Sequence, residues 1–350
     1  MQSAIQSYEH YSHESLLSLI KDDFLQCALH YTNNERAFEL TLNNGTTLSL
    51  LADGILAFNH NSKDQASKSI VLSCGIHGNE TAPIEICNQL VNDLLNEKIA
   101  TPHRVLFIFG NVASMAIAER FIEENLNRLF SAKQTSDSLE GKRASTIMNI
   151  VDNFFKASSE SADRIHYDLH TAIRPSKNEK FAVYPFLHSK PYSKQQLAFL
   201  SACDVNTILL SQSPTTTFSY YSSLHHHAHA FTVELGRVMP FGQNDMSKFI
   251  AVTAKLTELL TESAVKLLDF TQCQMEIYTV NQVINKHFDD FSLHFDDKIA
   301  NFATFSKGEI IASETNCEYR AQYDGEAIVF PNANVSIGQR ALLTVIPYEL

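Results

Sequence analysis

The stretch VLSCGIHGNETAPIE, residues 71–85, decides how the rest of the chain is interpreted. Its first four residues follow Ile70 in an apolar run, and such a run predicts a buried strand. Gly75 and Gly78 then permit a tight turn that other backbone can approach closely. Pro83 stands near the first turn of the helix that we expect to follow. The stretch therefore predicts a strand, a glycine turn and a helix in direct succession.

His77 and Glu80 lie on this turn in the pattern His-x-x-Glu. An imidazole and a carboxylate three residues apart, where a strand runs into a helix, can bind one Zn²⁺ from the same side. A catalytic zinc needs three protein ligands and one open position, and two histidines with a glutamate form one of the usual sets. Short patterns also arise by chance, so the alternative is a turn histidine beside a solvated glutamate. The zinc interpretation requires a second histidine elsewhere.

Size and charge restrict the possible classes of protein. The 350 residues allow one large domain and a smaller one. Hydrophobic residues make up 44% of the chain and charged residues 19%, which fits a globular protein with a substantial core. The formal net charge of −12 argues against nucleic acid and anionic membranes as partners of the surface as a whole. An anionic small substrate would need a local cluster of arginine and lysine.

The cysteines and the N-terminus bear on the compartment. Six cysteines are scattered without a Cys-x-x-Cys pair, which predicts reduced thiols in a cytoplasmic protein rather than disulfides or a cysteine zinc site. The first residues contain no basic segment followed by an apolar run, so we expect no signal peptide. We also expect no membrane span, which would need an apolar stretch of ~18 residues.

Buried strands alternate with helices over most of the chain, which predicts an α/β sheet. Strands are expected over residues 38–58, 104–109, 164–169, 180–185 and 228–235. Helices are expected over residues 12–25, 84–95, 141–157 and 193–200, and from Asn244 or Asp245 to about Leu268. After Phe270 the chain becomes rich in Val, Ile, Phe and Tyr with regular turn signals, so residues 276–350 predict a small β domain.

His170 is the best candidate for the second histidine, because it ends a predicted strand as His77 follows one. Ligands gather beyond the carboxyl ends of strands in open α/β sheets. Asp168 precedes it by two residues and leaves the same face, so it can accept the second N–H of a zinc-bound imidazole. A lone histidine after a strand is otherwise a surface or core residue.

Glu234, in the strand over 228–235, is the candidate general base, since a metal hydrolase needs a carboxylate that is not a ligand. Its alternative is an exposed strand glutamate. Arg120, Asn127 and Arg128 form a third group, whose guanidinium groups suit an oxyanion or a substrate carboxylate. An ordinary charged loop would account for that spacing equally well.

The run of histidines at 225–227 and 229 resembles a metal-binding tract. On a strand, however, successive side chains point to opposite faces, so the run cannot converge on one ion. We interpret it as a histidine-rich rim.

The motifs GIHGNETAPIE (75–85), DLHT (168–171) and ELG (234–236), with Arg120 and the NR pair at 127–128, resemble the zinc carboxypeptidase-like family that contains aspartoacylase and succinylglutamate desuccinylase. The stretches FAVYP (181–185), PFGQND (240–245) and EAIVFPNANVSIGQRA (326–341) are similar to the desuccinylase branch. The resemblance covers about residues 57–345, and the first 35 residues have no match.

The resemblance implies an α/β/α catalytic domain with a mixed central sheet over residues 1–270, and a small β domain over residues 271–350. It implies hydrolysis of N-succinylglutamate to succinate and glutamate, in arginine catabolism by the succinyltransferase route. One Zn²⁺ per chain would be bound by His77, Glu80 and His170. Glu234 would be the base, Arg120 would stabilise the oxyanion, and Asn127 with Arg128 would hold a substrate carboxylate.

Basic residues beside this chemistry support a small anionic N-acyl amino acid as substrate. They are Arg120, Arg128, Arg174, Lys177 and Arg237. The loop at 175–179 departs from the family, where Gly-Ser and His-Glu are expected, so fine specificity stays open. Aspartoacylase-like or peptidase activity and a non-catalytic binding protein of the same fold are the alternatives. The sequence does not determine the oligomeric state.

Overall fold

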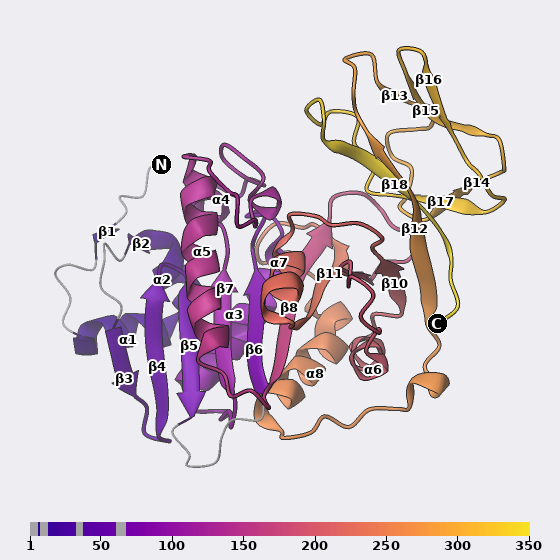
Figure 1. Ribbon diagram of the computed structural model, residues 1–350. Helices are drawn as coiled ribbons and strands as arrows, with labels where there is room; N and C mark the ends of the chain where they lie inside the picture. Colours follow the sequence, from indigo (N-terminus) through magenta and orange to yellow (C-terminus); the bar gives the residue numbers. More distant parts are fainter. Residues whose placement is uncertain (1–5, 8–12, 33–37, 61–67) are drawn as a thin grey trace.

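The computed structural model describes residues 6–7, 13–32, 38–60 and 68–350. Its main feature is one large mixed sheet, which extends from the N-terminal strands into the C-terminal part of the chain (Figure 1). Beginning at the middle of that sheet, the neighbouring strands are β10 (Thr207–Leu210), β9 (Phe181–Tyr184), β11 (His229–Arg237), β8 (Asp163–Ala172), β6 (Lys68–Cys74), β7 (Arg104–Phe109), β5 (Ile55–His60), β4 (Thr46–Ala52) and β3 (Phe38–Thr41).

Strand β6 is the central element that the sequence predicts. It is buried along its whole length and pairs in parallel with β7 and β8. β11 continues the parallel set beyond β8, whereas β9 and β5 run antiparallel to their neighbours β11 and β7. The carboxyl ends of β6, β8 and β11 therefore meet at one edge of the sheet, which is where ligand sites of α/β proteins form.

Helices cover both faces of the sheet, which confirms the predicted α/β/α architecture (Figure 1). One face is covered by α1 (His13–Asp22), α2 (Phe24–His30), α3 (Thr81–Leu95), α6 (Lys194–Ala202) and α8 (Ile250–Thr261). The other face is covered by α5 (Leu139–Lys156) and α7 (Phe218–His226). No described helix is long and apolar enough to cross a membrane.

Two helix predictions need correction. The helix expected over residues 12–25 is two helices, α1 and α2, that meet at Asp23, and residue 12 lies outside the described residues. The helix expected to reach Leu268 begins with a 3₁₀ turn at Met246–Phe249 and ends at Thr261. The carbonyl groups of Glu262 and Ser263 accept hydrogen bonds from Lys68 Nζ at 2.8 Å each, so they are held by β6 instead of a further helical turn.

The C-terminal part is a β domain that shares the sheet. Strand β12 (Glu276–Asn285) pairs in parallel with β10 and then antiparallel with β18 (Arg340–Pro347), which carries the sheet on to β17 (Glu326–Val329) and β14 (Ala303–Phe305). A second sheet contains β13 (Ser292–Leu293), β15 (Ile310–Glu314) and β16 (Cys317–Arg320). The boundary at residue 270 stays a prediction, since β12 joins both parts.

Arg143 on α5 fastens that helix to the carboxyl end of β7. Its guanidinium donates to the carbonyl oxygens of Gly110 at 2.6 Å, Asp53 at 2.7 Å and Phe109 at 2.8 Å. Arg143→Met should lower the free energy of unfolding by about 3 kcal/mol, because it removes hydrogen bonds from a charged donor and leaves three carbonyl groups without it. Urea denaturation measures this. Lys142→Met, at the exposed neighbouring position, should change stability by less than ~0.5 kcal/mol, and equal effects would contradict the assignment.

Candidate metal centre and active site

The glycine turn after β6 has the close approach that the sequence predicts. Gly75 has a positive φ of 61°. A Cβ atom at Gly78 would lie 2.3 Å from the backbone nitrogen of Met115, in the short helix α4 (Val112–Ala116). The Gly78 N–H also donates to the carbonyl of Arg120 at 3.2 Å. The turn therefore has to lack side chains at these positions for α4 and the Arg120 segment to pack on it.

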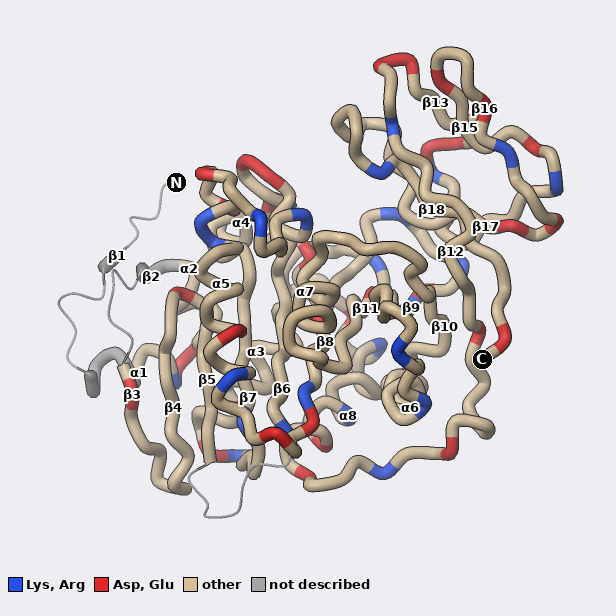
Figure 2. The backbone as a smooth tube through the Cα atoms, viewed as in Figure 1, with Lys and Arg blue, Asp and Glu red and all other residues tan. Residues whose placement is uncertain are grey.

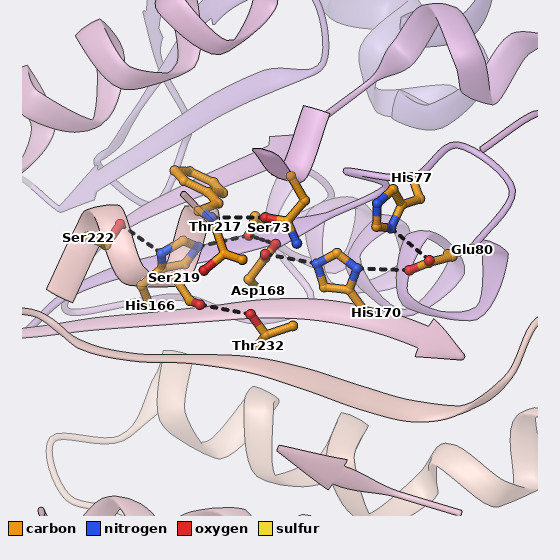
Figure 3. A network of polar contacts seen from close by, with 12 residues as sticks. Ser73, His77, Glu80, His166, Asp168, His170, Thr217, Ser219, Ser222 and Thr232 are labelled. Carbon is orange, nitrogen blue, oxygen red and sulfur yellow. Dashed lines mark hydrogen bonds and ion pairs between the residues drawn. The ribbon is translucent and has the colours of Figure 1, made fainter. Parts of the chain in front are cut away.

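His77, Glu80 and His170 converge at the carboxyl edge of the sheet (Figure 3). Glu80 Oε1 lies 2.8 Å from His77 Nδ1, and Glu80 Oε2 lies 2.9 Å from His170 Nδ1. One ligand atom from each residue can be chosen so that all three lie within 4.8 Å of one another, and all three residues are buried. They form a set that can hold a metal ion, and it is the set that the sequence selected.

The partners of the other ring nitrogens determine where the lone pairs point. His77 Nε2 lies 3.0 Å from Asn125 Oδ1, and His170 Nε2 lies 2.8 Å from Asp168 Oδ2. Both oxygens are acceptors, so each Nε2 carries the hydrogen and donates it. A neutral ring then presents its Nδ1 lone pair to Glu80. A carboxylate at this distance needs a metal ion or a ring hydrogen on each Nδ1. Burial acts to lower the pKa of His170, but Asp168 and Glu80 raise it well above its ordinary value, so without a metal this ring can donate a second hydrogen to Glu80.

At His77 a metal ion fits this requirement better than a ring hydrogen does. The contact between His77 Nδ1 and Glu80 lacks the geometry of a hydrogen bond, and the buried Nδ1 has no hydrogen-bond partner. Burial lowers the pKa of His77 to about 4, so its ring is neutral at neutral pH. The site offers two imidazole nitrogens and one carboxylate, which is the ligand chemistry of a catalytic zinc site. Each has an outer partner, since Asn125 and Asp168 bond to the rings and Arg120 bonds to the carboxylate.

Glu234 lies on β11 directly beside His170, its Cα partner on β8. The side chain is buried, and Oε2 has no hydrogen-bond partner, so the alternative of an exposed strand glutamate is wrong. Burial, followed by the negative charge of Glu80, raises the pKa of Glu234 to about 7. A carboxylate with that pKa can take up and release a proton near neutral pH.

Arg120 reaches the metal-ligand cluster from the loop after α4. Its Nη1 donates to Glu80 Oε1 at 2.7 Å. Asn127 is buried on the same loop, where its Oδ1 accepts the backbone N–H of Phe218 at the start of α7. Arg128 Nη1 donates to the Asn127 carbonyl, and its guanidinium pairs with no described carboxylate. Figure 2 shows basic residues in the loops around α4, at this end of the sheet.

Glu140 holds this loop, and the sequence did not single it out, because the predicted helix began one residue after it. Its buried carboxylate accepts the backbone N–H groups of Ile122 at 2.7 Å, and of Glu123 and Glu124 at 3.2 Å each. Asn111 donates to it as well, at 3.0 Å. Burial acts to raise the pKa of Glu140, but these hydrogen bonds hold it below its ordinary value. An acidic residue in the first turn of a helix was the available signal.

The loop after β8 holds the β domain against the catalytic domain. Arg174 Nη1 donates to the carbonyl of Asp297, and Lys177 N–H donates to the carbonyl of Asn301 at 3.0 Å. Asn301 in turn accepts the Phe330 N–H through its Oδ1 at 2.9 Å. Arg174, one of the basic residues that the sequence selected, therefore uses one of its N–H groups for the contact with Asp297. The side chains of Lys177 and Arg237 are exposed.

Arg340, at the start of β18, is a second residue that the sequence analysis missed. Its guanidinium carbon lies 5.6 Å from the centre of the Phe330 ring, and that ring lies 5.6 Å from the ring of Phe181, the Cα partner of Glu234. Burial, and then the charge of Arg128, lower the pKa of Arg340 to about 9. Its side chain makes no hydrogen bond or ion pair with any described residue.

The histidine run does not form a metal site within the described residues. His225 and His226 lie in the last turn of α7 and not on a strand, which corrects the geometry assumed from the sequence. His226 Nε2 bonds to Asp152 Oδ1 at 2.8 Å, and His227 Nδ1 lies 2.7 Å from Lys190 Nζ. These histidines therefore face different partners.

Known proteins resemble the chain along most of its length. The family model described as Succinylglutamate desuccinylase/Aspartoacylase catalytic domain matches residues 66–260, and the AstE/AspA barrel-sandwich hybrid domain matches residues 273–348. A succinylglutamate desuccinylase of Pseudoalteromonas atlantica is 54% identical over 330 residues, covering 93% of each chain. One of Idiomarina loihiensis is 50% identical over 321 residues, covering 91% of this chain and 93% of that protein.

Solved structures give the same relationship. The succinylglutamate desuccinylase of Vibrio parahaemolyticus superimposes with a TM-score of 0.85 at 36% identity, covering 93% of this chain and 95% of that one. The Vibrio cholerae enzyme gives a TM-score of 0.86 at 35% identity, with coverage of 93% and 96%. The chain belongs to the succinylglutamate desuccinylase/aspartoacylase family.

Proposed function

We propose that the chain is a zinc-dependent amidohydrolase that cleaves N-succinylglutamate to succinate and glutamate, in the cytoplasm and within arginine catabolism by the succinyltransferase route. The observation that carries the proposal is the convergence of two imidazole Nδ1 atoms on Glu80, beside the buried Glu234. The printed names of relatives at 54% and 50% identity support the choice of substrate.

His77, Glu80 and His170 would hold one Zn²⁺ per chain. A bound zinc ion would supply Lewis acidity, which polarises an amide carbonyl and lowers the pKa of a coordinated water to about 7. Asn125 and Asp168 keep the hydrogens of the two rings on Nε2, so both Nδ1 atoms stay available as ligands.

Glu234 would take a proton from water and pass it to the leaving amine of glutamate. Its burial excludes competing solvent, and the free Oε2 can accept that proton. Arg120 contacts Glu80 and sits beside the ligand cluster, so its remaining N–H groups can stabilise negative charge that develops on the amide oxygen.

Arg128 and Arg340 would bind substrate carboxylates, with the Asn127 amide as a further donor. Neither guanidinium pairs with a described carboxylate; Arg128 is exposed and Arg340 is half-buried, so both have donors free for an incoming anion. A chain of net charge −12 repels anions at long range, so such local cations are needed to attract the substrate. Arg174 can contribute its donors that do not bind Asp297.

The metal assignment is tested by His170→Ala. Zinc affinity, measured by competition with a chromophoric chelator, should fall by more than about 100-fold, since even outer partners of metal ligands are worth about 10–100-fold. His226→Ala is the matched control, because His226 is also buried and bonded to an aspartate, outside the site. Unchanged zinc affinity in His170→Ala would show that the metal is held elsewhere.

The role of the base is tested by Glu234→Gln. This variant should keep zinc and lose about 10²–10⁴-fold in kcat, because an amide cannot accept the proton. In the parent protein, kcat/KM should rise with pH along an acid limb whose apparent pKa is at most about 7, since a nearby cation favours the carboxylate. Near-normal turnover by the variant, or loss of its metal, would remove Glu234 from the mechanism.

The substrate is tested with a panel assayed on the zinc-loaded protein for released amino acid. N-Succinylglutamate carries three carboxylates, so kcat/KM should fall from it to N-acetylated acidic amino acids and then to peptides. Each lost charge pair should be worth ~1–3 kcal/mol, or roughly ten- to a hundred-fold. Arg128→Gln and Arg340→Gln should each lower kcat/KM for N-succinylglutamate by such a factor, whereas Arg320→Gln, on exposed β16, should not. Preference for acetylaspartate would favour aspartoacylase activity, and cleavage of peptides alone would contradict the charge argument.

A further inference from the structure

A continuous row of hydrogen bonds leads from His170 into the protein interior (Figure 3). Asp168 Oδ2 lies 2.8 Å from His170 Nε2, and Asp168 Oδ1 accepts from Ser73 Oγ at 2.5 Å. Ser73 Oγ lies 2.8 Å from His166 Nε2, and His166 Nδ1 lies 2.8 Å from Ser222 Oγ. All five residues are buried, on β6, β8 and α7.

The direction of every bond in this row follows from the acceptor at its centre. Ionised Asp168 only accepts, so it receives the hydrogens of Ser73 and His170. Ser73 has then used its single hydrogen and must accept from His166 Nε2–H. The other ring nitrogen of His166 has a lone pair and accepts from Ser222. No atom of the row is left without a matching partner.

We propose that Ser73, His166 and Ser222 are positioning residues of the metal centre, which fix the orientation of Asp168 and thereby direct the Nδ1 lone pair of His170 at the metal. The inference rests on the proposed zinc site, and it extends that site to residues that contact neither metal nor substrate. The new element is that buried residues on three secondary-structure elements hold Asp168 itself in place for its contact with His170.

The physical reason is the rigidity of a fully satisfied buried network. If Asp168 lost its bond from Ser73, the carboxylate could rotate about its terminal torsion, which is a soft one. The hydrogen of His170 would then no longer be held on Nε2 by a fixed acceptor. Reversing the row would put the His166 hydrogen on Nδ1 and leave a buried acceptor facing an acceptor at Ser73, which costs the full desolvation of one group. Burial also keeps His166 neutral, since its pKa is lowered to about 4.

The test compares alanine variants along and beside the row. Ser73→Ala should weaken zinc binding by about 10–100-fold, and Ser222→Ala by a smaller factor, because outer partners orient the ligands. Ser219→Ala is the matched control: Ser219 lies on the same helix, is equally buried, and bonds to Thr232 at 2.8 Å outside the row. Chelator competition gives the affinities, and thermal unfolding of the metal-free variants separates this effect from general destabilisation.

A second readout does not depend on the metal. Nitrogen-15 NMR of the metal-free protein should show His166 as a neutral ring with its hydrogen on Nε2, assigned with His166→Gln. If the hydrogen is on Nδ1, or if Ser73→Ala and Ser219→Ala bind zinc equally well, the positioning role is overturned. If the parent chain has the Nε2–H form of His166 but binds no zinc, the proposed metal site fails while the bonding direction stands.

Discussion

The whole site depends on the electrostatic requirement created by Glu80, whose two carboxylate oxygens face one imidazole nitrogen each. A buried carboxylate between two imidazole nitrogens requires a cation, either a metal ion or a ring hydrogen, on each side. Asn125 and Asp168 accept the Nε2 hydrogens of the two rings, so both Nδ1 atoms stay directed at Glu80. His77 Nδ1, which has no hydrogen-bond partner, is the part of this arrangement that only a metal ion would satisfy.

The order of the strands in the sheet brings these side chains together. β6, β8 and β11 are parallel neighbours, so the residues that end them or follow them come together at one edge of the sheet. The same register puts Glu234 beside His170. On one face of this sheet, α7 packs against β8, and it brings Ser222 to His166. The candidate base, the candidate metal ligands and the hydrogen-bond row thus result from one packing arrangement.

The β domain contributes Arg340 near the candidate site. β12 pairs with β10 and β18, so the domain is part of the main sheet rather than a flexible attachment. Asn301 links the loop after β8 to Phe330, and the ring of Phe330 supports Arg340. The domain therefore adds the Arg340 guanidinium to the cations near Arg128, whose charge it feels.

The sequence by itself determined the local features: the strand, glycine turn and helix over 71–85, the candidate ligands His77 and Glu80 three residues apart, and Asp168 on the same strand as His170. These follow from backbone geometry and side-chain alternation, which act over a few residues. Only the tertiary structure decided the rest. Ser73 and His166 are 93 residues apart in the chain, and His166 and Ser222 are 56 apart. The end of α8 and the placement of Glu140 and Arg340 depend equally on distant contacts, because hydrogen-bond partners are chosen by packing in space and no short-range pattern encodes them.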